Sequence, residues 1–210
     1  MKRWLFIAVA IVLLSGLAYA QQRGGGFSDS DGGAINWYGQ SIAFVVGIDS
    51  YSHGWPHLSQ AVNDAKRMEA ALKARGFRVY TIYDKKATYP EIVNSLRRAA
   101  AVTGPNDAFL FYFAGHGYTQ KSAWDGTEAG FLVPVDAKSG DTSGYLSVSQ
   151  LRDEITTQCK ARHVMLVLDS CFSGTLLTRA QLGDGEVADY LSKRGIFGIT
   201  AGMQDQPAVD

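Results

Sequence analysis

Apolar runs and helix-patterned segments alternate along most of the chain. Five short runs rich in apolar and β-branched residues predict buried strands, at residues 42–48, 77–83, 109–113, 164–168 and 196–200. Apolar residues at helical spacing lie between them, around residues 61–72, 92–99, 148–155 and 187–193. Alternating strands and helices predict an α/β fold with a mostly parallel sheet and helices on both faces.

Two local patterns refine this outline. Residues 118–144 fit neither period and hold one short apolar piece, FLVPV, so they are interpreted as a loop or a hairpin. Ser147 and Gln150 have the spacing of a capping box and mark the start of the helix around 148–155.

The N-terminal residues predict an export signal. Lys2 and Arg3 precede an apolar stretch that ends at a small-x-small site, Ala18-Tyr19-Ala20, as in a secretory signal peptide. The expected organisation is a signal peptide over 1–20, a flexible Gly- and Ser-rich leader over 21–40, and one domain over 41–210. The product is then periplasmic or secreted, without stable membrane insertion after cleavage; a retained anchor is the alternative.

Charge and cysteine content narrow the function classes. Loss of Lys2 and Arg3 leaves 18 basic against 20 acidic residues, which predicts no affinity for nucleic acid. The chain has only 2 cysteines, Cys159 and Cys171, and therefore no disulfide framework. A bridge between them is the alternative to a passive Cys159 thiol, but it would consume the candidate nucleophile described next.

Two strands end in a potentially reactive side chain. The segment FLFYFAGHG presents His116 and VMLVLDSCFSG presents Cys171, and Asp49 ends the first strand. Ligand and catalytic groups in parallel sheets collect beyond the carboxyl ends of the strands. A thiol and an imidazole placed there are the parts of a cysteine hydrolase. Glycines on both sides of His116 are expected to leave its imidazole unshielded. Each residue alone has an ordinary structural interpretation, a histidine in a strand-to-loop turn or a buried cysteine, but the pair favours chemistry.

These motifs resemble those of the caspase-like cysteine peptidases, family C14, and among them the metacaspases and their bacterial relatives. The match covers the GHG around His116, the DSCFSG at 169–174, and also NDA at 63–65 and GFLVPVDA at 130–137. The separation of 55 residues between His116 and Cys171 is close to the caspase spacing of about 50. The resemblance implies a three-layer sandwich, a His116–Cys171 dyad acting on a peptide or protein, and an oxyanion hole from the backbone N–H groups of Gly117 and Cys171.

The metacaspase branch also suggests a substrate preference. Acidic residues line its specificity pocket, and the matching positions are Asp64 and Asp169. Two carboxylates there would select Arg or Lys before the scissile bond through charge-assisted hydrogen bonds. For Asp64 the alternative is a first-turn carboxylate that stabilises the helix dipole.

The chain departs from the family pattern in places. Ala114 stands where some relatives carry serine, and no pattern for the family's final strand precedes Asp210, so that strand is expected to be missing. Some relatives require calcium, but the carboxylates of Asp125, Glu128, Asp136 and Asp141 show no ordered ligand spacing, so no metal site or cofactor is predicted.

Two other function classes compete with the peptidase. One is a catalytically silent caspase-like interaction scaffold, whose expected mark is loss of the histidine or the cysteine. The other is a doubly wound ligand-binding domain, which the absence of a Gly-rich phosphate loop after any strand disfavours.

Overall fold

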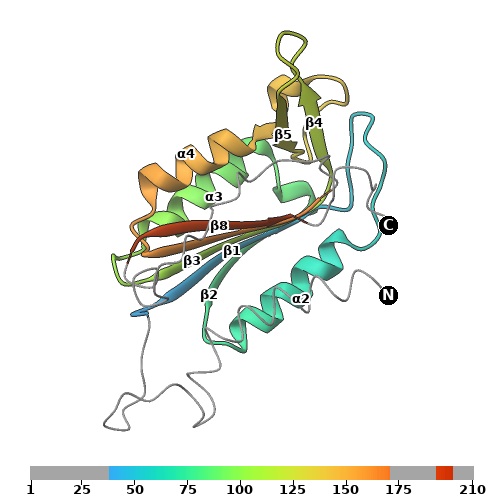
Figure 1. Cartoon of the computed structure of the whole chain (residues 1–210). Coiled ribbons are helices and arrows are strands. Elements are labelled where there is room, and N and C mark those ends of the chain that lie inside the picture. The colour runs from blue at the N-terminus through green and yellow to red at the C-terminus, as the bar shows by residue number, and fades with distance from the viewer. Residues whose placement is uncertain (1–37, 171–192, 201–210) are drawn as a thin grey trace, which may run out of the picture.

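A five-stranded parallel sheet forms the centre of the molecule. The computed structural model describes residues 38–170 and 193–200. The sheet has the order β2-β1-β3-β7-β8, with every neighbouring pair parallel. Its strands are β1 (Ser41–Gly47), β2 (Arg78–Tyr83), β3 (Ala108–Ala114), β7 (His163–Asp169) and β8 (Gly195–Thr200). The predicted α/β fold with a parallel sheet is confirmed (Figure 1).

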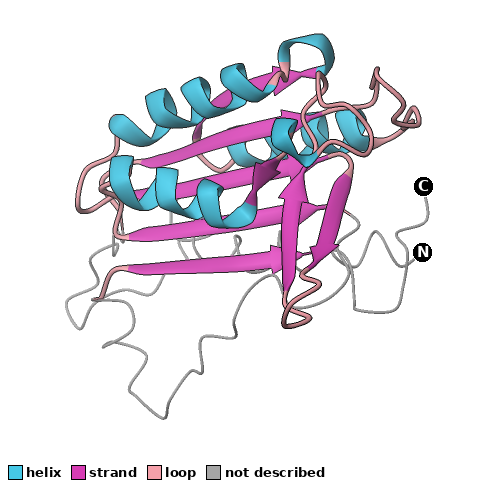
Figure 2. Cartoon of the chain, turned by 90° about the horizontal axis from the view of Figure 1, so that it is seen from above, coloured by secondary structure: helices cyan, strands magenta, loops and turns pink. Residues whose placement is uncertain are grey.

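Helices cover the two faces of this sheet. Helix α2 (Ala61–Lys73) packs below it in Figure 1, and α3 (Tyr89–Ala101) and α4 (Val148–Gln158) lie side by side above it. Viewed from above, the pair of helices runs along the strands (Figure 2). The result has three layers, with helices on both faces of the sheet as the alternating pattern predicts.

Alternation along β3 shows how the sheet divides the core. Phe109, Phe111 and Phe113 pack under α3 and α4, whereas Leu110 and Tyr112 pack against α2. All seven residues of β3 are buried, as expected for a central strand covered on both faces. Burying one large apolar side chain stabilises a fold by about 1.5–3 kcal/mol, so this strand contributes heavily to stability.

A second, smaller sheet rises from the end of β3. It has the order β4-β5-β6 and is antiparallel. Its strands are β4 (Gly117–Lys121), β5 (Glu128–Leu132) and β6 (Leu146–Ser147), and two short helices, η1 (Asp84–Lys86) and η2 (Thr142–Gly144), lie in the connections. The hairpin interpretation of the 118–144 segment is therefore correct.

The capping box that begins α4 is only half formed. The Ser147 hydroxyl accepts a hydrogen bond from the Gln150 N–H at 3.0 Å. The Gln150 side chain instead donates to the Tyr89 hydroxyl at 2.5 Å, which ties α4 to α3. The sequence marked the helix start correctly but not the tertiary contact.

Several sequence predictions fall outside the described residues. These are the signal peptide, the leader up to residue 37, Cys171, the helix around 187–193 and any strand beyond residue 200. Within residues 38–170 and 193–200, none of the helices has the length and apolar character needed to cross a bilayer.

Candidate active site

The carboxyl ends of β1, β3 and β7 meet at one edge of the sheet. The strands are in register there, with Gly47 beside Ala114 and Ala114 beside Asp169. The Gly115 N–H donates to the Asp169 carbonyl at 3.4 Å, which extends the contact one residue past β3. His116 follows directly, and on the β7 side the last described residue is Ser170. The topology thus brings the GHG and DSCFSG motifs to neighbouring strand ends.

A backbone carbonyl fixes the tautomer of His116. Its Nε2 lies 2.8 Å from the Pro56 carbonyl oxygen. Because a carbonyl oxygen only accepts, Nε2 carries the proton and donates it to this bond. Nδ1 is then the ring nitrogen that can take a proton from another group.

Two aromatic rings contact the imidazole. The ring centroids of Tyr51 and Trp55 lie 4.7 Å and 5.0 Å from that of His116. His116 is consequently half-buried rather than unshielded between its glycines, which corrects the expectation from the sequence. A Cβ at Gly115 would lie 2.5 Å from the Tyr51 hydroxyl, so this glycine makes room for the tyrosine.

Tyr51 also holds the backbone of the histidine. Its hydroxyl accepts the His116 N–H at 2.9 Å and donates to the Val133 carbonyl at 3.1 Å. Burial raises the pKa of Tyr51 well above its ordinary value, so the hydroxyl keeps its proton and remains a donor. One side chain therefore joins the β1–α2 loop, the GHG turn and the segment after β5.

The β1–α2 loop is fastened at its start by Asp84. The Asp84 carboxylate accepts the N–H groups of Asp49 and Ser50 at 2.8 Å and 2.9 Å. Burial raises the pKa of Asp49 most, the backbone N–H groups at the start of α2 lower it, and the Asp84 charge raises it again. Asp49 therefore links the end of β1 to the start of α2, on either side of the loop that carries Tyr51, Trp55 and Pro56.

The Gly117 N–H has a free direction in the small sheet. Gly117 lies opposite Leu132, and the Val133 N–H donates to the His116 carbonyl at 3.0 Å. In antiparallel pairing this pattern makes Gly117 and Leu132 a non-hydrogen-bonded pair, whose N–H groups point away from each other. Among the described strands β4 pairs only with β5, so the Gly117 N–H points away from its partner strand in that sheet.

Asp64 and Asp169 lie on the same side of the large sheet. Asp169 has the strand parity of Val167, which packs with α2 residues, and the Tyr112 hydroxyl donates to its carboxylate at 3.2 Å. Asp64, in the first turn of α2, is only 6% exposed and pairs with Arg67 at 3.4 Å.

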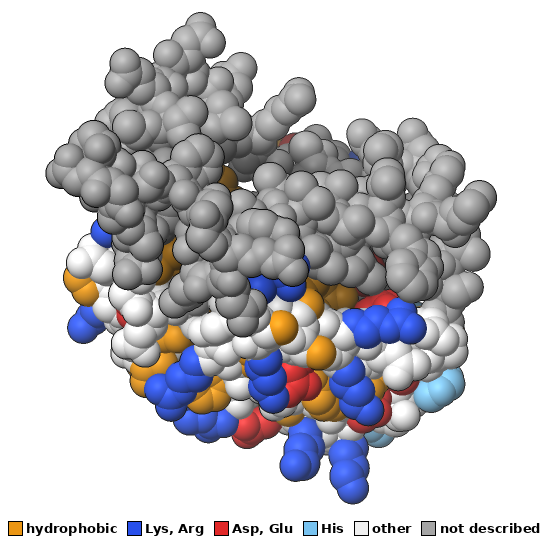
Figure 3. Space-filling model, turned by 90° about the horizontal axis from the view of Figure 1, so that it is seen from below, with side chains coloured by type: hydrophobic (Ala, Val, Ile, Leu, Met, Phe, Trp, Pro, Cys, Tyr) orange, Lys and Arg blue, Asp and Glu red, His pale blue; other side chains and the backbone are white. Residues whose placement is uncertain are grey.

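The flank of α2 that carries Asp64 faces away from β2. Lys66 and Glu69 both contact Tyr83 of β2. Asp64 is rotated by roughly 140–200° from them around the helix, toward the β3 and β7 side. Figure 3 shows the molecule from below. Where described residues are visible in this view, basic side chains stand among acidic and apolar ones. Asp64 and Asp169 thus lie on the same side of the sheet, the side that α2 covers.

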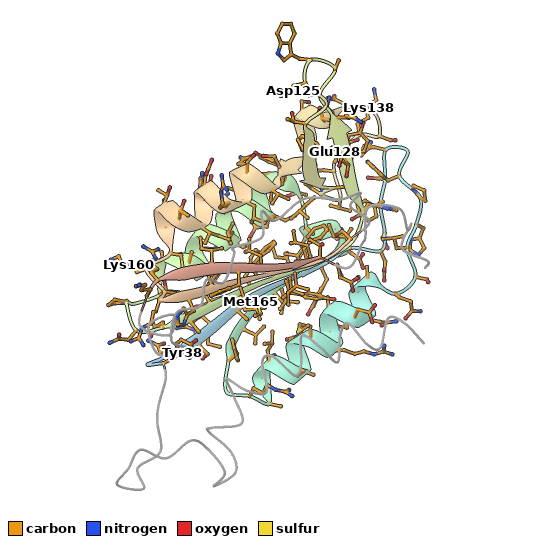
Figure 4. All side chains as sticks on the ribbon, in the orientation of Figure 1. Tyr38, Asp125, Glu128, Lys138, Lys160 and Met165 are labelled. Carbon is orange, nitrogen blue, oxygen red and sulfur yellow. The ribbon has the colours of Figure 1, made fainter. Side chains whose placement is uncertain are left out.

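The second cysteine lies at the opposite edge of the sheet. Cys159 is a free thiol, 2% exposed, with its Sγ 3.4 Å from the Thr103 hydroxyl. It precedes β7, whose seven residues separate it from the carboxyl edge by roughly 20 Å. The neighbouring Lys160 marks this end of the sheet in Figure 4. Cys159 therefore has the core position of a passive thiol.

The four candidate calcium ligands do not come together. Asp125 and Asp141 accept hydrogen bonds within their own turns, from Thr127 and Ser143. Asp136 accepts the Tyr89 N–H at 2.8 Å, and Asp125 and Glu128 lie on the β4–β5 hairpin (Figure 4). Among the residues that the structure describes, no three His, Cys, Asp or Glu side chains form a potential metal site.

Comparison with known proteins identifies the family of this chain. The model of the caspase domain matches residues 40–206. The chain belongs to the caspase-domain family. Members of this family are generally cysteine peptidases. No curated protein matches the chain.

One solved structure resembles the chain over part of its length. The chain is similar to protein GSU0716 from Geobacter sulfurreducens, with 27% sequence identity and a TM-score of 0.55. The match covers 65% of this caspase-domain chain and 52% of that protein, so it spans about half of the latter's length.

Sequence reasoning missed the residues that hold His116. Pro56 acts through its carbonyl, which every residue possesses, and so leaves no mark in a sequence. Tyr51 and Trp55 belong to a polar loop, YSHGWPH. Two large aromatic residues in a polar loop after a strand end were the available signal. Nothing local in that loop indicates a histidine 60 residues away.

Proposed function

We propose that this caspase-domain protein is a cysteine endopeptidase whose dyad is His116 and Cys171. The observation that carries the proposal is the fixed tautomer of His116, because Nε2 donates to Pro56 and leaves Nδ1 as a base. Cys171 follows Ser170 in the chain, directly after the strand that pairs with β3. This placement supports a thiol partner for the imidazole.

The reaction follows from these roles. The Cys171 thiol gives its proton to Nδ1 and the thiolate attacks the peptide carbonyl, forming a C–S bond. The N–H groups of Gly117 and Cys171 would stabilise the oxyanion, and the outward direction of the Gly117 N–H supports this. The imidazolium then protonates the leaving amine as the C–N bond breaks. Water, deprotonated by His116, hydrolyses the thioester and restores the thiol.

Cleavage after Arg or Lys is the substrate preference that the charges support. Asp64 and Asp169 both lie on the α2 side of the sheet, near the strand end that precedes Cys171. A guanidinium between two carboxylates would form bidentate, charge-assisted bonds and relieve their mutual repulsion. The Tyr112 hydroxyl, already bonded to Asp169, would orient that carboxylate.

Thiol labelling tests the dyad. A peptidyl electrophile ending in Arg should modify wild type and Cys159→Ala, but not Cys171→Ala. Removing the base should slow labelling by about 10²–10⁴-fold in His116→Ala and leave His163→Ala unchanged. Labelling that persists in Cys171→Ala, or is equal in wild type and His116→Ala, would overturn the dyad and favour the interaction scaffold.

A peptide panel tests the preference separately. Peptides that differ only before the scissile bond, with Arg, Lys, Asp or Leu there, should be cleaved in favour of Arg and Lys. Asp64→Asn and Asp169→Asn should each lower kcat/KM for Arg peptides, while labelling by iodoacetamide stays close to wild type. Equal turnover of all four peptides would show that the pocket assignment is wrong even if the dyad stands.

A further inference from the structure

Trp55 packs its ring against the candidate catalytic histidine. The indole and imidazole centroids are 5.0 Å apart, with an interplanar angle of 32°, so the two rings are closer to parallel than to edge-on. On another side the indole meets Tyr145 edge-on at 5.8 Å. Tyr145 is only 4% exposed and contacts the rings of Tyr118 and Phe131, so Trp55 is backed by a packed aromatic wall.

The polar end of Trp55 is unpaired in the part of the chain that the structure describes. Its Nε1 is buried and has no hydrogen-bond partner. An unpaired buried N–H is unfavourable, and native structures contain few of them. Leu would fill much of this space without that penalty. The indole is therefore better explained by its broad aromatic face, which is the part that contacts His116.

One hydrogen bond does not fix an imidazole. The bond from Nε2 to Pro56 still allows the ring to turn about the N–H···O direction, which would swing Nδ1 away from a single position. A flat ring stacked on the imidazole removes that freedom. Because Trp55 and Pro56 are adjacent in sequence, one turn supplies both restraints.

We propose that Trp55 is a positioning residue, which holds the His116 ring plane so that Nδ1 stays in place to exchange a proton with the thiol. This inference rests on the proposed His116–Cys171 dyad. It concerns how the base is held and not which substrate is bound.

The experiment compares Trp55→Leu, Trp55→Phe and Trp124→Leu in the whole protein. Trp124 is 96% exposed on the β4–β5 hairpin and is the matched control for losing an indole. Iodoacetamide, which needs no specificity pocket, measures the reactivity of Cys171 in a Cys159→Ala background. Trp55→Leu should slow alkylation about threefold to thirtyfold, Phe should restore most of the rate, and Trp124→Leu should equal wild type.

Proton NMR of the His116 ring provides a readout that does not depend on activity. The stacked indole shifts the resonances of the imidazole protons by its ring current. This contribution should disappear in Trp55→Leu, while thermal unfolding of the variant remains cooperative. Wild-type ring shifts and rates in Trp55→Leu would overturn the proposal, as would a loss that Phe does not reverse. If His116→Ala leaves wild-type alkylation unchanged, the dyad fails, and the ring shifts alone then decide whether Trp55 holds the histidine.

Discussion

At the scale of single residues, Tyr51 joins three parts of the site through one hydroxyl. It accepts the N–H of His116 and donates to the carbonyl of Val133. Both of these backbone groups belong to segments with little access to water, since Gly115 and Val133 are buried. Loss of the hydroxyl would leave two buried polar groups without this partner.

We therefore predict that Tyr51→Phe lowers the free energy of unfolding by about 1–3 kcal/mol, as expected for buried groups that lose their hydrogen bonds. Urea unfolding followed by fluorescence measures this change. Tyr118→Phe is the matched control, because Tyr118 is half-buried in the same aromatic cluster, and it should change stability by less than about 0.5 kcal/mol. Equal effects of the two substitutions would contradict the role of the Tyr51 hydroxyl.

Some residues of the candidate site could be recognised in the sequence, and others could not. His116 was identifiable because a polar residue between two glycines ended a fully apolar strand. Asp169 was identifiable as a candidate because it is the first residue of the DSCFSG motif. Pro56 was not, because the carbonyl that it offers is common to all residues, and the contact closes a loop of 60 residues.

At the scale of elements, the periodicity of apolar residues was a sufficient guide to the strands and helices of the large sheet. Its strands are covered on both faces, so they form continuous apolar runs that stand out. The β4–β5 hairpin is exposed on one side and short, and its segment showed only the FLVPV piece. Its pairing depends on register with β6, which local pattern does not encode.

A charged contact between α2 and β2 gives a pH-dependent prediction. The Glu69 carboxylate accepts from Lys73 and from the Tyr83 hydroxyl, both at 2.6 Å. The hydrogen bond from Lys73 lowers the pKa of Glu69 most, followed by that from Tyr83. A carboxyl group with a lowered pKa stabilises the fold above its unfolded pKa and loses this contribution as pH falls through its folded pKa.

Glu69→Gln should thus lower the free energy of unfolding at pH 7 by about 1 kcal/mol or less, since the carboxylate is partly exposed to solvent. The difference in the free energy of unfolding between wild type and variant should become smaller as pH falls below about 4. Urea unfolding at a series of pH values measures it, with the exposed Glu128→Gln as control. A gap that is constant with pH would show that the charge of Glu69 does not matter.

At the scale of the whole molecule, the candidate site lies where the buried central sheet meets the partly exposed β4–β5 hairpin. Strand β3 has a parallel neighbour on each side and is buried throughout. The β4–β5 hairpin begins only two residues after β3 ends, and most of its outer half is exposed. His116 and Gly117 are at the junction. The candidate base is thus tied to the core, whereas Gly117 belongs to the hairpin.

Hydrogen exchange should reveal this boundary. Amides of Phe109–Phe113 should exchange only through global unfolding, because opening β3 breaks two ladders and exposes the core on both faces. The ladder amides of Gln120 and Ala129 have one partner strand and partial solvent exposure. Their opening free energy should be lower by at least about 2 kcal/mol, which is about 30-fold in exchange rate.

Measurement by NMR in low denaturant separates the two groups, because exchange of the β3 amides should respond to denaturant as steeply as global unfolding does. Protection of Gln120 and Ala129 equal to that of β3 would show instead that the hairpin and the sheet open as one unit, and that His116 and Gly117 are held equally firmly.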